Sequence, residues 1–214
     1  MKRKTNRRRN APLRIGITGG IACGKSSVSK VLAEKGALVI DTDEIAHALL
    51  AGPNPTYNAV LERFGADLVD EPAGPINRKR LGQIVFNDLQ AKRELEEIMH
   101  PAIDAQMLQA MDKANRGQVV AVQIPLLFEC KLHEKDYFDE IWVITVDPAI
   151  QLERLMKRNN LTQEEAQKRI NSQMSQNEKT KLSDRAINNS GTPPETRAAV
   201  LHQLRAAKKK ANLA

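Results

Sequence analysis

The sequence predicts an α/β fold with a mainly parallel five-stranded sheet flanked by helices and with a helical insertion. Short apolar segments alternate with segments of helical composition, and this alternation indicates a parallel sheet with crossover helices. A glycine-rich turn joins the first apolar segment to the first helix. Two blocks stand outside the alternation: 56–115, which has helical composition and is interpreted as a helical insertion, and the charged block 154–185.

The first two strands are expected at 13–18 and 37–40, on either side of a helix that begins at Lys25 and ends before Gly36. Asp41-Thr42-Asp43 follows the second strand and is placed to begin another helix, because Asp and Thr are favoured at helix N-termini. In the helical insertion, polar breaks are expected at 71–75 and at His100-Pro101.

The second half of the chain returns to strand composition. Segments 119–124 and 141–146 are rich in β-branched residues, as buried parallel strands are, and a fifth strand is expected at 185–188. Asp147-Pro148 predicts a helix start, and the Thr/Glu spacings at Thr162 and Thr192 predict capping boxes for two further helices.

The net charge of +7 suggests a polyanionic partner, but the basic residues are concentrated at the two ends. Residues 1–10 and 205–214 together hold ten Lys or Arg and no acid, so residues 11–204 are slightly acidic overall. Aromatic residues make up only 3%, too few for a surface that stacks single-stranded bases. We therefore expect no specific nucleic-acid partner, and we assign 1–12 and 205–214 to disordered basic tails around one domain at 13–204.

Cysteine content and hydropathy indicate the compartment. Two cysteines, Cys23 and Cys130, are too few for a disulfide framework, and no apolar run approaches the ~20 residues of a membrane-spanning helix. The sequence predicts a cytoplasmic protein that does not enter a membrane.

The glycine-rich turn matches the phosphate-binding pattern G-x-x-x-x-G-K-[ST] from Gly19 to Ser26, and it lies between a strand and a helix as that pattern requires. In such a P-loop, backbone N–H groups cradle phosphate oxygens, Lys25 reaches the outer phosphates and Ser26 can hold Mg²⁺. The expected nucleotide-binding residues are Gly20, Ile21, Ala22, Cys23, Gly24, Lys25, Ser26 and Ser27. A second hypothesis holds that the electropositive loop favours a reactive Cys23 thiolate; the alternative is a small side chain that fills the loop.

A P-loop by itself does not separate GTPases, motors and kinases. The chain has no N-K-x-D segment of the guanine-reading type and no D-E-x-x run after an apolar strand. Both absences favour a small-molecule kinase, with Asp41 or Asp43 placed to accept a hydroxyl proton or to help hold Mg²⁺, or only to cap a helix.

Five segments in order carry a family resemblance: T-G-G-I-x-x-G-K-S at 18–26, V-I-D-x-D-x-I-A at 39–46, His100-Pro101, P-L-L-F-E at 125–129 and N-N-S-G at 188–191. Together they resemble dephospho-CoA kinases, and the similarity extends over 13–204. The resemblance implies a P-loop kinase fold of the nucleoside-monophosphate-kinase type, in which the block 56–115 would be a helical substrate-binding region and the block 154–185 a mobile helical lid. It also implies ATP-dependent phosphorylation of the ribose 3′-hydroxyl of dephospho-CoA, the last step of coenzyme A synthesis, with Mg²⁺ as cofactor.

The resemblance also implies roles for individual residues. Asp43 would be the general base, and Asp41 a supporting or Mg²⁺-linked residue. Segment 125–129, with Leu126 and Phe128, would border the substrate site, although packing is an alternative for these two. His100 would contact substrate or stabilise a helix break. Two positions depart from the family pattern: Ala22 replaces an inner glycine, and His47 replaces a common arginine.

The lid is expected to supply cations, because phosphoryl transfer spreads negative charge over the migrating group. Arg154 and Arg158 lie four residues apart on one predicted helix face and are the candidates. Another small-molecule kinase of the same fold and a nucleotide-dependent nucleic-acid binder are the alternative functions.

Overall fold

The computed structural model describes residues 11–213, which form two compact units, 11–40 with 113–213 and 41–112. The expected N-terminal tail lies outside the described residues, apart from Ala11 and Pro12. Within 11–213, no helix combines the length and the apolar composition needed to cross a membrane.

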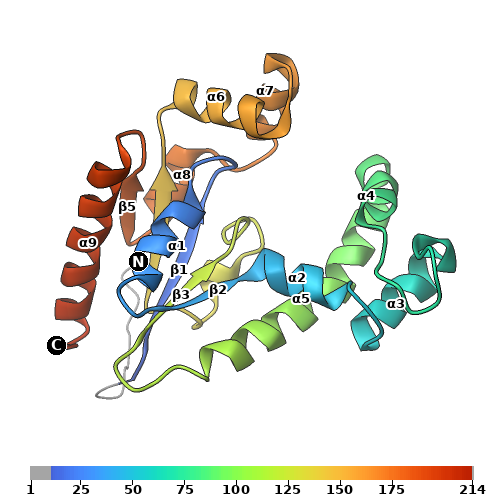
Figure 1. Cartoon of the computed structure of the whole chain (residues 1–214), viewed down its shortest axis with the longest axis horizontal. Coiled ribbons are helices and arrows are strands. Elements are labelled where there is room, and N and C mark those ends of the chain that lie inside the picture. Colours follow the sequence, from blue (N-terminus) through green and yellow to red (C-terminus); the bar gives the residue numbers. More distant parts are fainter. Residues whose placement is uncertain (1–10, 214) are drawn as a thin grey trace. The chain divides into compact units, whose positions relative to one another are not determined.

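The first unit is built on the expected five-stranded sheet, in the order β2-β3-β1-β4-β5 (Figure 1). The central strand β1 pairs in parallel with β3 and β4, and β4 pairs in parallel with β5. The strands are β1 (Leu13–Gly19), β2 (Leu38–Asp41), β3 (Val119–Gln123), β4 (Glu140–Thr145) and β5 (Arg185–Asn188). Each expected strand is confirmed to within about one residue at either end.

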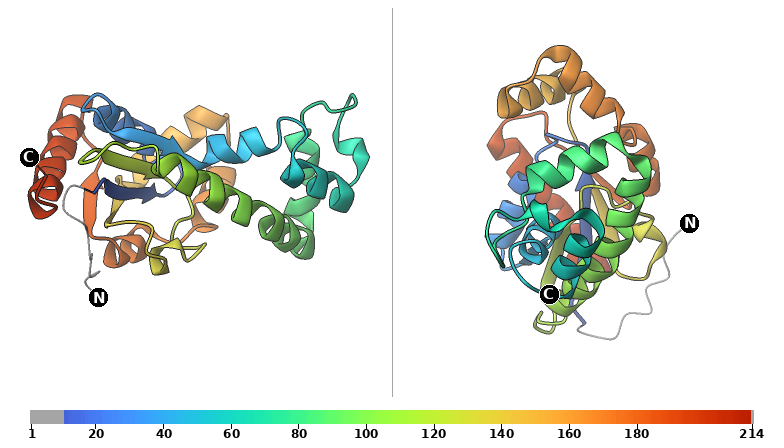
Figure 2. Two further views of the ribbon diagram at one scale, coloured as in Figure 1. Left: turned by 90° about the horizontal axis from the view of Figure 1, so that it is seen from below. Right: turned by 90° about the vertical axis from the view of Figure 1, so that its right-hand side faces the viewer.

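Helices α1 (Lys25–Ala33) and α9 (Pro193–Lys210) pack against each other and share a buried apolar core with the sheet. This core includes alternate strand residues such as Ile15, Ile17 and Ile144, because side chains alternate between the two faces of a strand. Figure 2 shows α9, the last helix of the chain, in red beside the sheet.

The expectation of a disordered C-terminal tail at 205–214 is wrong for residues 205–210. Residues 205–210 are the last turns of α9, where Ala207 is fully buried in the core and Lys210 Nζ lies 3.0 Å from Glu140 Oε1. The basic composition of this segment suggested disorder, but its small apolar residues fall on the helix face that packs against the sheet.

The lid segment contains three helices, α6 (Pro148–Asn159), α7 (Gln163–Asn171) and α8 (Gln176–Leu182). Asp147 caps α6 with Pro148 at its first position, and the capping boxes expected at Thr162 and Thr192 are both present. Helix α8 begins with a further capping box, from Ser175 and Glu178.

The second unit is helical, as expected of the insertion, but it begins at Asp41 rather than near residue 56. Its helices are α2 (Thr42–Leu49), α3 (Pro55–Phe64), α4 (Arg78–Asn87) and α5 (Leu89–Met111), with a short 3₁₀ turn at Ala66–Leu68. Helix α2 belongs to this unit because it packs against α5 around a core that includes Leu49, Tyr57 and Met99.

The helix break expected at His100-Pro101 is wrong. Pro101 lies inside α5, which is one long helix (Figure 2). A proline inside a helix removes a hydrogen bond, but packing of α5 against α2, α3 and α4 holds the helix together across this position.

Candidate functional site

The P-loop follows β1 and ends where α1 begins, and its backbone requires glycine at two positions. Gly24 caps α1 in the left-handed region, and a Cβ there would lie 2.0 Å from the side-chain nitrogen of Asn189. At Gly19, a Cβ would lie 2.5 Å from the carbonyl oxygen of Ile144. The two glycines therefore let the loop pass close to β4 and to the segment after β5.

Ala22 also has a left-handed backbone, with φ of 60°. This conformation costs a residue with a Cβ roughly 1 kcal/mol, which glycine avoids. The departure from the family's inner glycine is therefore a point of backbone strain inside the P-loop.

Ile21 is held on both sides by side chains of the lid segment and of α6. Its N–H donates to Gln173 Oε1 at 2.8 Å, and its carbonyl accepts from Gln151 Nε2 at 2.8 Å. Gln176 Nε2 donates to Gln151 Oε1, also at 2.8 Å. A chain of amide side chains thus fixes the two peptide groups of the P-loop on either side of Ile21.

Lys25 and the two serines that follow it lie in the first turn of α1. The Lys25 ammonium donates to the carbonyl oxygens of Gly19 and Gly20 at 2.9 and 3.3 Å, so it lies over the loop. Ser26 and Ser27 are exposed at the helix N-terminus, where backbone N–H groups favour an anion.

Cys23 is completely buried, which contradicts the hypothesis of a reactive thiolate. Burial raises the pKa of its thiol, although the positive charges of Lys25, Lys179 and Arg154 act in the opposite direction. Cys23 therefore fills the loop as a small neutral side chain, and its backbone carbonyl accepts a hydrogen bond from Asn189 at 2.8 Å.

The structure distinguishes the two lid arginines. Arg154 of α6 is half-buried and close enough to the P-loop to act electrostatically on the thiol of Cys23. Arg158, one turn later, is exposed, and its Nε donates to Asn159 Oδ1 at 2.9 Å.

The segment after β3 contains both expected apolar contacts, but in different environments. Leu126 is 38% exposed, whereas Phe128 is buried and packs edge-to-face against His133 with ring centroids 5.2 Å apart. Burial favours the packing role for Phe128, and Leu126 remains a candidate substrate contact.

The other candidate residues belong to the second unit. Asp41 caps α2 by accepting the N–H of Asp43 at 2.9 Å, so the capping role expected at this position is present. The side chains of Asp43, His47 and His100 are exposed.

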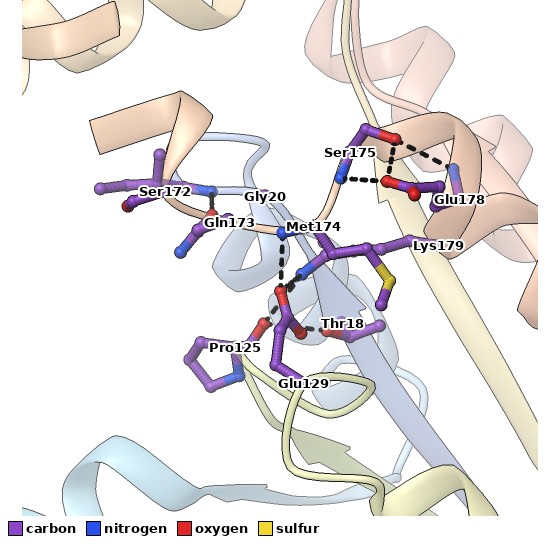
Figure 3. Close-up of polar contacts among 12 residues, drawn as sticks. Thr18, Gly20, Pro125, Glu129, Ser172, Gln173, Met174, Ser175, Glu178 and Lys179 are labelled. Atoms are coloured by element: carbon purple, nitrogen blue, oxygen red, sulfur yellow. Dashed lines mark hydrogen bonds and ion pairs between the residues drawn. The ribbon is translucent and has the colours of Figure 1, made fainter. Parts of the chain in front are cut away.

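Several residues that hold the site were not predicted from the sequence. The buried Asn189 links the P-loop to the Thr196 hydroxyl, which donates to Asn189 Oδ1 at 2.8 Å. Glu129 and the buried Lys179 form an ion pair of 2.8 Å beside the loop (Figure 3). For Asn189 the one available signal was its place in the N-N-S-G segment, and for Glu129 its place in P-L-L-F-E.

The donor set around the P-loop fits a magnesium ion that arrives with phosphate. Within 11–213, no group of three or more His, Cys, Asp or Glu side chains forms a metal cage. The exposed Ser26 hydroxyl is an oxygen ligand beside Lys25, and Mg²⁺ commonly keeps several waters and binds substrate phosphates. The residues are therefore suited to a metal bound mainly by the nucleotide.

Comparison with known proteins adds independent information. The sequence profile of the dephospho-CoA kinase family matches residues 13–195. The dephospho-CoA kinase of Bacillus cereus is 43% identical over 201 residues, covering 93% of this chain and 97% of the relative.

Two solved structures are similar over 92% of this chain and 97% of their own lengths. They are the protein TT1252 from Thermus thermophilus, with a TM-score of 0.78 and 27% identity, and the dephospho-CoA kinase from Campylobacter jejuni, with a TM-score of 0.60 and 31% identity.

Proposed function

Because the chain belongs to the dephospho-CoA kinase family, we propose that it transfers the γ-phosphoryl group of ATP to the ribose 3′-hydroxyl of dephospho-CoA. The products are coenzyme A and ADP, and the reaction completes coenzyme A synthesis in the cytoplasm. The observation that carries this proposal is the family match over residues 13–195, which begins at β1 and includes the whole P-loop.

ATP is bound by the backbone N–H groups of the P-loop and by Lys25. The ammonium of Lys25, which lies over the loop carbonyls, neutralises charge on the outer phosphates. Ser26 supplies a hydroxyl ligand to Mg²⁺, which neutralises charge on the phosphate oxygens when bound.

Asp43, which is exposed, accepts the proton of the attacking hydroxyl. Asp41 holds the start of α2 and so fixes the backbone of Asp43. His100 and Leu126 contact dephospho-CoA, and Phe128 supports the segment that carries Leu126.

Arg154 and Arg158 stabilise the charge that spreads over the transferred phosphoryl group. The lid carries these cations, and its closure over bound ATP excludes water that would otherwise accept the phosphoryl group.

Substrate choice tests the proposal. The protein is incubated with Mg-ATP and, separately, dephospho-CoA, AMP, CMP, UMP or shikimate, and release of ADP is measured. We expect ADP to appear with dephospho-CoA and not with the other acceptors. Release of ADP with a different acceptor alone would assign the protein to another small-molecule kinase activity, and a Lys25→Ala variant controls for contaminating kinases.

A further inference from the structure

Lys179 is an unusual anchor for the lid. From residue 167 to residue 186 it is the single buried side chain, with no exposed surface. The apolar residues of this stretch are only partly buried or exposed, and Leu182 is 48% exposed. The one fully buried side chain in the C-terminal part of the lid is therefore charged rather than apolar.

The ammonium of Lys179 is held by the segment that follows β3. It lies 2.8 Å from Glu129 Oε1 and donates to the carbonyl oxygen of Pro125 at 3.4 Å (Figure 3). The same carbonyl accepts from the hydroxyl of Thr18, the residue before the P-loop, at 3.1 Å. Lys179 thus lies where the lid, the start of the P-loop and the 125–129 segment meet.

Glu129 holds the lid at a second point. Its Oε1 atom also accepts the backbone N–H of Met174 at 3.2 Å. One carboxylate oxygen therefore binds both ends of the six-residue stretch from Met174 to Lys179, as Figure 3 shows.

Two glutamines of this part of the lid contact the P-loop or its neighbours. Gln173 precedes Met174 and accepts the N–H of Ile21, while Gln176 begins α8 and bonds Gln151, which donates to the Ile21 carbonyl. A cavity of about 680 Å³ is lined by Gly20 and all three glutamines. Gln176 is also held by the backbone of Val146, whose N–H donates to Gln176 Oε1 at 2.8 Å and whose carbonyl accepts from Gln176 Nε2 at 3.0 Å. Gln173, which directly precedes Met174, is therefore the glutamine whose position follows from the contacts of Glu129.

We propose that Glu129 and Lys179 are positioning residues that act through Gln173 to hold the N–H of Ile21, and thereby the P-loop, ready for ATP. Neither residue needs to touch substrate. Their effect on turnover rests on the proposed kinase function, whereas their effect on ATP binding does not depend on the acceptor.

A neutral double variant separates positioning from stability. Removing one partner of a buried ion pair leaves an uncompensated charge and destabilises the fold, whereas replacing both with neutral groups of similar size is often tolerated. Glu129→Gln with Lys179→Met removes both charges and keeps an amide oxygen that can accept the Met174 N–H. Lys181→Met, an exposed lysine on the same helix, is the matched control.

Three quantities are measured for each variant: the thermal midpoint, the affinity for Mg-ATP by calorimetry, and hydrogen exchange at the Ile21 amide. We expect the double variant to unfold near the wild-type temperature but to bind ATP about tenfold more weakly and to exchange the Ile21 amide about tenfold faster. Lys181→Met should match wild type in all three. Wild-type ATP affinity and wild-type Ile21 exchange in a folded double variant would overturn the proposal.

Gln173→Ala provides a test that can still be made if the double variant does not fold. This half-buried residue makes no contribution to the buried core, so its removal should leave the thermal midpoint unchanged while weakening ATP binding and speeding exchange at Ile21. Unchanged ATP affinity in Gln173→Ala overturns the proposed route. If Gln173→Ala binds ATP more weakly and wild type releases no ADP with dephospho-CoA, the positioning role is supported and the proposed acceptor is rejected.

Discussion

The side-chain amide of Asn189 donates to the backbone carbonyl of Cys23 at 2.8 Å, which joins the segment after β5 to the P-loop. The same nitrogen fills the space where a Cβ on Gly24 would stand. The shape of the P-loop therefore depends on a residue near the other end of the domain, which is itself held by Thr196 of α9.

Replacement of Asp43 tests its proposed role as the general base. Asp43→Asn keeps the backbone N–H that donates to Asp41, so α2 should remain capped while the proposed proton acceptor is lost. We expect kcat to fall by about 100-fold or more with little change in the KM for ATP, measured by ADP release. The adjacent exposed Glu44→Gln is the control, and an unchanged kcat in Asp43→Asn would remove this residue from the mechanism.

The two lid arginines should differ in their effect on turnover. Arg154→Ala removes a cation that acts on the P-loop, and we expect kcat to fall by about 100-fold while ATP affinity changes little. Arg158→Ala should lower kcat less, because its side chain is exposed. Lys157→Ala, also exposed on α6, controls for loss of charge. Equal rates for wild type and Arg154→Ala would contradict the assignment.

Glycine at position 22 should stabilise the protein. Ala22→Gly removes the left-handed strain at φ of 60°, and we expect the free energy of unfolding in urea to rise by about 1 kcal/mol. Ala73→Gly provides a comparison, because Ala73 has φ of 61° in an exposed loop of the second unit. It should give a similar gain with no effect on ATP binding, and a loss of stability in both variants would refute the strain argument.

Glu140 should make stability depend on pH in acid. Burial raises the pKa of this carboxyl, but hydrogen bonds from Arg185, Trp142 and Lys210 outweigh burial and lower the pKa from 4.5 to about 2. A lowered pKa contributes stability above pH 4.5 that is lost as the pH falls towards 2. The lowered pKa of Glu140 stabilises the folded state by on the order of 3 kcal/mol at neutral pH. The part of this that comes from the exposed Lys210 is smaller than its geometry suggests, because solvent screens that charge.

Urea unfolding at pH 6 and pH 3 measures this contribution. Wild type should lose more stability between the two values than Glu140→Gln, which has no carboxylate to protonate. At pH 6, Glu140→Gln should be less stable than wild type by roughly 3–5 kcal/mol, because Arg185 is left without its carboxylate partner. Parallel pH profiles for the two proteins would exclude Glu140 as the source.

Cys23 should resist alkylation in the folded protein. Its thiol is buried and its pKa is raised, so little thiolate forms near neutral pH, whereas Cys130 is half-buried. Iodoacetamide treatment followed by peptide mass spectrometry should label Cys130 first, and both cysteines should react in urea. Faster labelling of Cys23 in the native protein would restore the hypothesis of a reactive thiolate.

The sequence by itself determined the features that depend on neighbours along the chain. Strand composition located β5 at Arg185–Asn188. A Thr with a Glu three residues later located two capping boxes, because the contacts of a capping box form within one helical turn. The glycine and lysine spacing located the P-loop, because its pattern is contained in the continuous segment from Gly19 to Ser26.

Tertiary structure alone decided the contacts between distant segments. Composition predicted a disordered tail at 205–214, but residues 205–210 are helical because α9 packs one face on the sheet. No local pattern distinguishes Lys179 from the exposed Lys181, since burial depends on where α8 meets Glu129 and Pro125. The same holds for Asn189 and for the glutamines around Ile21, whose partners are brought within hydrogen-bond distance only when the strands and the lid have packed.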